Sequence, residues 1–422
     1  MKRTLKIWTC VLAFFLFCVP AHASIAVSGA YAALISEEGE VIVKPGQYAD
    51  IECVMEDKLY AARDPDTGRY LLMNEKGEAL TQALYSSFDI LKDGRILCLK
   101  SGKYGVLDPE LHEIVAFEYT WIVPNGEGEY LALRTDIWDD YADGLYRIDN
   151  TGYVSPTGVK VSSFLSDFEN GLSPALSAEN GRYGYLNADG QWKIRAQYAY
   201  AGSFENDYAV ATLDSGSGVI DTAGNWKITP RYDFIDIGNG EIILAVDYRD
   251  GVTAYDRNTF EIRFTLDYEL YGAYVSSGGS RLFVYAPEFV CVIDNDGREI
   301  MRLNKDGFVI QGENGNLIVC ETNGEYETAY LADENGNPLS EEYLNISPIF
   351  TFDGTGYYSV CRFKDRIEHT ILTGVIDDTG KEVIPLSDAE LSVPKDGYVL
   401  LENDHGMELY ALDNTLIWAY EY

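Results

Sequence analysis

One short segment concentrates the residue types that bind hard cations. Calcium prefers several carboxylate oxygens offered by one loop, so closely spaced aspartates are candidate metal ligands. The Asp-x-Asp-x-Asp-Gly spacing of an EF-hand is absent here, and an acidic, solvated loop between structural units is the alternative interpretation. The four aspartates and two aromatic residues of segment 136–144 are Asp136, Trp138, Asp139, Asp140, Tyr141 and Asp143.

Signatures of enzymatic chemistry are scarce in the rest of the chain. After the first 23 residues, the histidines are His112, His369 and His405. The sequence contains no HExxH pair and no GxSxG motif, so we predict neither a catalytic site nor a resident cofactor, with calcium as the open exception. A pair of carboxylates acting as in glycosidases stays open, because the 68 acidic residues offer many pairs and sequence does not report their separation.

The charge balance narrows the class of partner. The chain has 32 Lys and Arg against 68 Asp and Glu, for a formal charge of −36. Such a surface repels nucleic acid and anionic lipid and favours cations or basic partners. We therefore expect no nucleic-acid partner.

The N-terminus has the pattern of a secretory signal. Lys2, Arg3 and Lys6 precede an apolar stretch at residues 7–19, and the small residues Ala21 and Ala23 then form a cleavage pattern. This apolar stretch is shorter than the roughly 20 residues that a membrane-spanning helix needs. We predict a signal peptide at 1–23, a mature chain at 24–422, secretion to the exterior or cell surface, and no membrane insertion.

A short pattern recurs along the whole chain: an apolar run ends in Asp or Asn, and a glycine follows three residues later. Asp or Asn opens a type I turn through its side chain, and Gly accepts the positive φ that closes it, so each copy predicts a β-hairpin. A third apolar strand follows about 20 residues after each turn. Eleven units, spaced 34 to 44 residues apart, place the turn-closing position at Gly39, Gly77, Leu111, Gly152, Gly190, Gly224, Thr259, Gly297, Gly336, Gly380 and Leu416.

Aromatic residues follow the same period. Tyr85, Tyr119, Tyr198 and Tyr232 each stand eight residues after a turn-closing position. They have two interpretations: a row of platforms for sugar rings, or a repeated packing position between units, which we favour. The candidate ligand-binding aromatic residues are Trp138, Tyr141, Trp192 and Trp226.

Residues 182–246 carry a family resemblance. One unit reads Gly184, Tyr185, Gly190, Ile194, Tyr198, Phe204, Ala209 and Val210, and the next reads Gly218, Asp221, Gly224, Ile228, Pro230 and Tyr232. This stretch resembles the WG-repeat (KWG) family of bacterial proteins, and segments 104–108 and 374–380 resemble it more weakly. The resemblance implies secreted or surface β-repeat proteins whose biochemical role is mostly unassigned. The family's Trp before Gly is replaced here by Tyr104, Tyr183, Ser217 and Thr373.

Hairpin units of this length cannot bury an apolar face alone and must stack. We predict an all-β tandem array over 24–422, with about eleven units as propeller-like blades in one or two rings or as an open superhelix. Because the chain stops just after a hairpin, we expect the final unit to be incomplete and to act as a cap.

The periodic framework and the lack of catalytic motifs favour one functional hypothesis. We predict a secreted, non-enzymatic scaffold that binds a protein, a peptide or a cell-surface (cell-wall) glycan. The alternatives are a propeller-type carbohydrate-active enzyme using paired carboxylates, and a module whose acidic loops need calcium.

Overall fold

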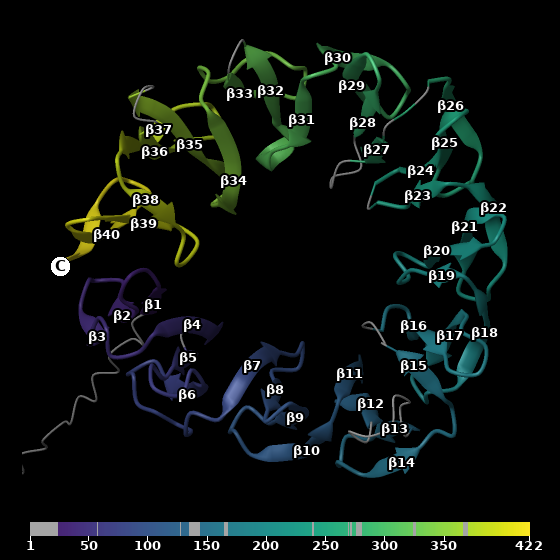
Figure 1. The fold of residues 1–422 in the computed structure, drawn as a ribbon, viewed down its shortest axis with the longest axis horizontal. Coiled ribbons are helices and arrows are strands. Elements are labelled where there is room, and N and C mark those ends of the chain that lie inside the picture. The colour runs from purple at the N-terminus through teal and green to yellow at the C-terminus, as the bar shows by residue number, and fades with distance from the viewer. Residues whose placement is uncertain are drawn as a thin grey trace, which may run out of the picture.

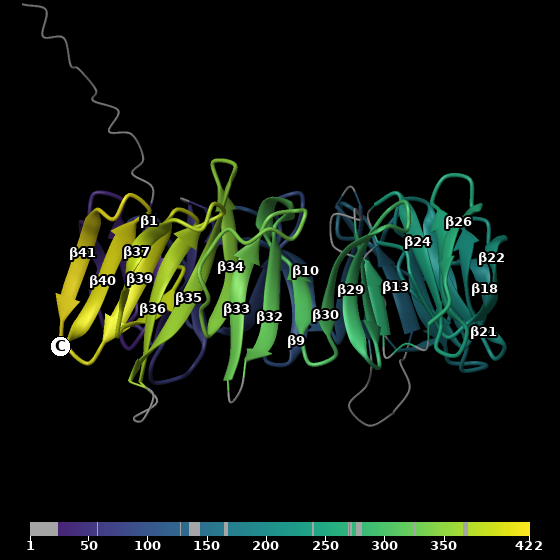
Figure 2. The ribbon, with the colours of Figure 1, turned by 90° about the horizontal axis from the view of Figure 1, so that it is seen from above.

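The chain forms antiparallel sheets arranged in one ring around a wide central opening (Figure 1). This computed structural model describes residues 24–56, 58–126, 128–134, 144–163, 168–238, 240–268, 270, 272–275, 281–323, 326–365 and 370–422. Seen from above, the strands run across the thickness of the ring (Figure 2). Within the described residues the secondary structure is β, apart from a single 3-10 turn at Glu313–Gly315.

The described strands fall into eleven consecutive groups, which we call blades 1 to 11. Blades 1 to 4 are β1 (Ser24–Val27), β2 (Ala33–Ser36), β3 (Val41–Val43); β4 (Asp50–Met55), β5 (Leu59–Arg63), β6 (Tyr70–Asn74); β7 (Tyr85–Ile90), β8 (Ile96–Lys100), β9 (Lys103–Leu107), β10 (Glu113–Tyr119); and β11 (Trp121–Gly126), β12 (Glu129–Arg134), β13 (Gly144–Ile148), β14 (Val154–Pro156). Blades 5 to 8 are β15 (Val161–Ser163), β16 (Leu172–Ser177), β17 (Tyr183–Asn187), β18 (Trp192–Tyr198); β19 (Tyr200–Ala201), β20 (Tyr208–Leu213), β21 (Gly216–Asp221), β22 (Trp226–Tyr232); β23 (Phe234–Asp236), β24 (Ile242–Asp247), β25 (Gly251–Asp256), β26 (Ile262–Leu266); and β27 (Gly272–Val275), β28 (Arg281–Ala286), β29 (Phe289–Asp294), β30 (Glu299–Asn304). Blades 9 to 11 are β31 (Phe308–Gln311), β32 (Leu317–Asn323), β33 (Tyr326–Ala332); β34 (Asn345–Phe352), β35 (Thr355–Asp365), β36 (Thr370–Asp377), β37 (Glu382–Ser387); and β38 (Glu390–Ser392), β39 (Tyr398–Asn403), β40 (Gly406–Ala411), β41 (Leu416–Glu421).

Each four-stranded blade is a meander whose first strand lies innermost and whose fourth lies on the perimeter (Figure 1). Blades 2 and 3 join into one seven-stranded sheet because Tyr70 of β6 pairs with Tyr85 of β7. The predicted fold class is therefore confirmed, and among the predicted assemblies the structure has one ring.

The repeated turn links the third and fourth strands of a blade and is built as the sequence predicts. The amide of Gly224 donates to the carbonyl of Asp221 (2.8 Å), and Asp221 Oδ1 accepts the amides of Ala223 (3.0 Å) and Asn225 (2.9 Å). Gly224 has φ of 84°, which a residue with a side chain rarely adopts. Leu111 takes the same role at φ 68°.

Two predicted turn positions are wrong by one or two residues. The positive-φ residue is Phe260 rather than Thr259. The turn that starts at Asp256 is one residue longer, and the amide of Phe260 donates the hydrogen bond to the Asp256 carbonyl. Near the C-terminus it is Asn414 rather than Leu416, because the turn runs from Ala411 to Asn414.

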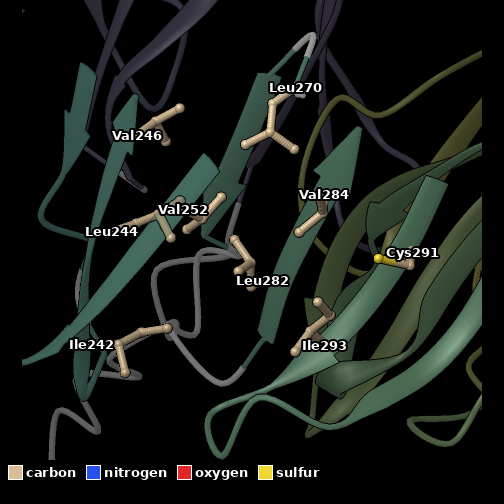
Figure 3. Close-up of a cluster of buried hydrophobic side chains, with 9 residues drawn as sticks. All are labelled: Ile242, Leu244, Val246, Val252, Leu270, Leu282, Val284, Cys291 and Ile293. Carbon is tan, nitrogen blue, oxygen red and sulfur yellow. The ribbon is translucent and has the colours of Figure 1, made fainter. Parts of the chain in front are cut away.

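The core lies between neighbouring blades. Figure 3 shows Ile242, Leu244 and Val246 of β24 facing Leu282 and Val284 of β28, so one blade's sheet packs on the next. Burying a side chain of this size contributes about 1.5–3 kcal/mol. Similar clusters at successive interfaces make stability depend on contacts between neighbours.

The repeated glycine also sets how closely blades approach. A Cβ on Gly380 of blade 10 would lie 2.3 Å from the carbonyl oxygen of Leu339 in blade 9. At Gly39 of blade 1 it would lie 2.2 Å from the carbonyl oxygen of Ile417 on β41 of blade 11. The first and last blades therefore meet through the same interface as consecutive blades.

Polar contacts repeat across these interfaces as well. Asn125 Nδ2 of blade 4 donates to the carbonyl of Ala188 in blade 5 (2.8 Å), and Asn316 Nδ2 of blade 9 donates to that of Asp378 in blade 10 (2.8 Å). In both cases the acceptor directly follows the turn-opening residue. Lys395 Nζ of blade 11 meets Glu37 Oε1 at the same position in blade 1 (3.2 Å).

Among the strands that the structure describes, none is exchanged between the ends to close the ring. Blade 1 is built from β1 to β3 and blade 11 from β38 to β41, and the two pack through a buried cluster that includes Ile25, Ile35, Leu400, Leu409 and Trp418. The prediction that the final unit is incomplete is wrong. Blade 11 has four strands because the repeated hairpin forms the outer half of a blade, whereas the described three-stranded units are blades 1, 2 and 9.

Within the described part of the chain, no helix is long and apolar enough to cross a membrane. Cys98, Cys291 and Cys320 are buried free thiols, which act as small hydrophobic side chains. Burial raises the pKa of Cys98 and Cys320 to about 12, so these thiols stay protonated and unreactive near neutral pH.

Candidate functional site

The predicted metal and aromatic candidates of segment 136–144 cannot be placed. Asp136, Trp138, Asp139, Asp140, Tyr141 and Asp143 all lie outside the described residues. Among the residues that are described, no three His, Cys, Asp or Glu side chains gather in a group that could hold a metal ion. Calcium binding by the segment stays a prediction.

Trp192 and Trp226 begin the outermost strands β18 and β22 and are half-buried. Trp192 packs against the buried cluster between blades 4 and 5, and Trp226 against the one between blades 5 and 6. The ring of Trp226 meets that of Tyr198 edge to face, with centroids 5.9 Å apart. Both tryptophans therefore contribute to blade packing, which leaves only part of each ring open to a ligand.

The periodic tyrosines are buried between blades. Tyr198 and Tyr232 are 1% and 4% exposed, and Tyr85 and Tyr119 are similarly buried. Each pairs with the first or second residue of the preceding strand, as Tyr198 does with Tyr183 and Tyr232 with Ser217. The packing interpretation is correct for these four residues, and they offer no platform to a sugar.

A pocket of about 410 Å³ lies between blades 6 and 7. Its walls include the innermost strands of the two blades, β19 and β23, and the part of the β20–β21 hairpin that lies toward its turn. Figure 1 places these innermost strands at the inner edge of the ring. The lining residues are Tyr200, Gly202, Ser203, Glu205, Val210, Thr212, Ser217, Phe234, Ile235, Asp236 and Ile237.

Two aromatic side chains at equivalent positions flank this pocket. Tyr200 starts β19 and Phe234 starts β23, and they are 54% and 40% exposed. The Tyr200 ring also contacts Tyr183 of blade 5, with centroids 6.1 Å apart. Both rings are therefore open to solvent at the pocket.

Apolar side chains and hydroxyl groups form the rest of the lining near the strands. Ile235 and Ile237 are buried, and the hydroxyls of Thr212 and Ser217 lie 2.9 Å apart in a shared hydrogen bond. An apolar concave surface with a few polar groups is the usual composition of a ligand site.

Two carboxylates line the pocket, and one buried arginine lies near them. Glu205 and Asp236 line the pocket, and Asp236 Oδ1 accepts the amide of Gly238 (2.9 Å). Arg257, which is buried, donates through Nη2 to the carbonyls of Ile237 and Gly238. Burial lowers the pKa of Arg257 while the Glu205 and Asp236 charges oppose that shift, so the guanidinium lies near both acids.

A second pocket of about 520 Å³ lies on blade 11. Its lining is acidic, with Asp388, Glu390, Glu402 and Asp404 accompanied by Asn403, His405 and Tyr422. It shares two repeat positions with the first pocket, because Glu390 corresponds to Tyr200 and Glu402 to Thr212. Asp388 is paired with Lys364 (2.7 Å), and Glu402 accepts the amide of Ala30 in blade 1 (3.0 Å).

Sequence reasoning did not single out Tyr200, Phe234, Glu205 or Asp236. A signal for the aromatic pair was present, because both stand two residues after a periodic tyrosine and 34 residues apart. That the position is exposed at the inner edge while its neighbour is buried depends on blade packing and is not readable from the period.

Comparison with known proteins finds a family match for the most regular part of the chain. Residues 183–215 and 218–246 match the family described as "WG containing repeat", which confirms the resemblance for two adjacent units. No curated protein sequence matches the chain.

Solved structures show similarity only in overall arrangement. A eukaryotic initiation factor shares 9% identity with a TM-score of 0.47, covering 86% of this chain and 96% of its own. BamB from Moraxella catarrhalis shares 11% with a TM-score of 0.33, covering 78% and 94%. The computationally designed Ika8 protein shares 12% with a TM-score of 0.30, covering 75% and 95%.

Proposed function

We propose that this protein is a secreted, non-enzymatic ring scaffold that binds a protein, a peptide or a cell-surface glycan at its inner edge. The observation that carries the proposal is a pair of pockets on one repeated framework whose shared repeat positions differ in residue type. Tyr200 and Thr212 of the pocket between blades 6 and 7 correspond to Glu390 and Glu402 of the acidic pocket on blade 11.

This pattern is typical of repeat proteins, which hold variable surface residues on a constant stack. The scarcity of histidine and the absence of the sequence motifs of common hydrolases support binding rather than turnover. The charged and apolar pattern of residues 1–23 supports export.

Capture by immobilised mature protein tests the proposal. Residues 24–422 are exposed to isolated bacterial cell-wall material and, separately, to the secreted protein fraction of the same culture. We expect saturable retention of one of these, reduced by the double substitution Tyr200→Ala and Phe234→Ala. The matched control is Tyr153→Ala, which removes a 69% exposed tyrosine on the loop leading to β14 of blade 4, away from both pockets.

Two results would count against the proposal. Saturable hydrolysis of a wall polysaccharide by the purified protein would favour an enzyme with paired carboxylates. Equal retention by the wild type, the double variant and the control would show that the inner-edge aromatic residues are not the binding surface.

A further inference from the structure

We infer that the pocket between blades 6 and 7 is a binding site for the cationic side chain of a lysine or arginine in a basic peptide segment of a partner. This inference rests on the proposed binding function and specifies its ligand. Four observations carry it: the aromatic pair, the carboxylates, the size of the pocket and the charge of the whole chain.

The aromatic pair supplies the first element of cation recognition. A cation is attracted to the face of an aromatic ring within about 6 Å of its centre, and several rings around one pocket form a cage for it. Tyr200 and Phe234 come from adjacent blades and are both exposed at this pocket. Tyr200 is held in place on one side by Tyr183.

The carboxylates supply the second element. Glu205 and Asp236 line the same pocket, and the charge that faces them from the packed elements is the buried guanidinium of Arg257. That guanidinium donates to two backbone carbonyls of blade 7. Two acids against one arginine leave a net negative site, which disfavours an anionic ligand and favours a cation.

The size and the polarity of the lining favour a side chain over a free metal ion. A pocket of about 410 Å³ accommodates a long aliphatic stem as well as its charged end. Val210, Ile235 and Ile237 offer apolar surface to such a stem, as lysine and arginine stems require. The described residues hold no cluster suited to a metal ion.

The chain as a whole would attract a basic segment to this site. Its formal charge of −36 raises the local concentration of cationic partners and speeds their encounter. The same charge also produces nonspecific attraction, so the test must separate pocket binding from general acidity.

The test uses the whole mature protein and four probes in fluorescence anisotropy at 150 mM and 500 mM NaCl. The probes are labelled tetra-lysine, tetra-arginine and tetra-glutamine amides and a labelled neutral chito-oligosaccharide. We expect one saturable site for the cationic peptides that persists at 500 mM NaCl, and no binding of tetra-glutamine.

Substitutions then assign the site. The double substitution Tyr200→Ala and Phe234→Ala is expected to weaken binding of the cationic peptides about ten-fold, since both ring faces that attract the cation are removed. Glu205→Gln is expected to weaken them several-fold. Asp207→Asn is the matched control. It removes the same charge two residues from Glu205, and Asp207 itself does not line the pocket.

Each other outcome overturns the inference. Equal peptide affinity in wild type and double variant would assign the binding to general acidity. Loss of oligosaccharide binding in the double variant, with peptide affinity unchanged, would assign the pocket to a sugar. If no probe binds while the wild type still captures a partner that the double variant fails to capture, the inference fails and the proposed binding function stands.

Discussion

The interface between blades 5 and 6 and the junction of blades 11 and 1 show the same packing built from different sequences. In blades 5 and 6 the turns of Gly190 and Gly224 are regular, lie within segments that match a known repeat family, and are followed by the buried Tyr198 and Tyr232. At the junction, Trp418 of β41 stands where β18 of blade 5 has Ile194. Ser36 opens the turn of blade 1 in place of aspartate or asparagine, and the pocket on blade 11 is acidic. The comparison teaches that glycine placement and apolar burial define the ring, while pocket residues vary freely.

The largest expected effect separates a packing residue from a pocket residue where blade 5 passes into blade 6. Tyr198→Ala should lower the free energy of unfolding by about 3–5 kcal/mol, because it opens a cavity between blades 5 and 6. Tyr200→Ala, only two residues away, should cost below about 1 kcal/mol because this ring is exposed. Urea denaturation of both variants checks this, and similar costs would contradict the assignment of Tyr200 to the pocket.

The next prediction compares the two interfaces directly. Gly224→Val and Gly39→Val each place a branched side chain at positive φ and against the preceding blade. Each should cost at least about 2 kcal/mol from backbone strain and crowding.

Thermal or urea unfolding of the two glycine variants measures this comparison. If Gly39→Val costs much less than Gly224→Val, the contact between Gly39 and Ile417 is absent in solution and the ring is open there. Gly68→Val, at positive φ with open space around its Cβ position, reports the strain alone.

Acid should weaken the aspartate turns but not the turn of blade 1. Hydrogen bonds from the side chains of Thr151 and Asn337, together with backbone amides, hold the pKa of Asp149 and of Asp333 below its usual range. The backbone amide of Thr259, with the Arg263 side chain, lowers the pKa of Asp256 to about 2. Because these pKa values are depressed in the folded state, their stabilisation is complete above about pH 4 and is lost as pH falls toward about 2. Ser36 has no such carboxyl group.

Hydrogen exchange of the turn amides between pH 5 and pH 2.5, corrected for intrinsic rates, follows this loss. Protection of the amides around Asp333 should fall more steeply than that around Ser36. Parallel loss at both turns would show that the carboxylates do not stabilise the turns, and Asp333→Asn should flatten the response at its own turn.

The smallest expected effect concerns the ion pair at the junction. Lys395→Ala removes the contacts with Glu37 and Glu56 and should lower the free energy of unfolding by about 0–1 kcal/mol. The loss should shrink in 0.5 M NaCl. A loss of several kcal/mol that is insensitive to salt would mean that Lys395 holds the ring closed by packing.

The sequence predicted most of the local structure because its signals are local. The Asp221 side chain and Gly224 specify a turn regardless of what surrounds them, and the period of such turns counted the blades correctly. The turns closed by Phe260 and Asn414 were misplaced because they depart from the repeated spacing: the first is one residue longer, and the second begins at Ala411 rather than at Asp413.

The remainder depends on contacts between distant residues. Closure requires Ile25 and Leu400 to pack together, and a repeat spacing does not encode the angle between blades that brings them into contact. The pocket was missed for a related reason. Tyr198 and Tyr200 look alike in the sequence, and only the packing of blade 6 against its neighbours buries one and exposes the other.

The distance between the turns of blades 11 and 1 tests the closed ring most directly. Spin labels at Asp413 and Glu38, in a background with the exposed Cys53 replaced by serine, give that distance by double electron–electron resonance. The matched pair is Asp189 and Ala223, the equivalent positions of blades 5 and 6. Closure by the common interface predicts two narrow distributions with closely similar means, and a longer or broader distribution for Asp413 and Glu38 would contradict it.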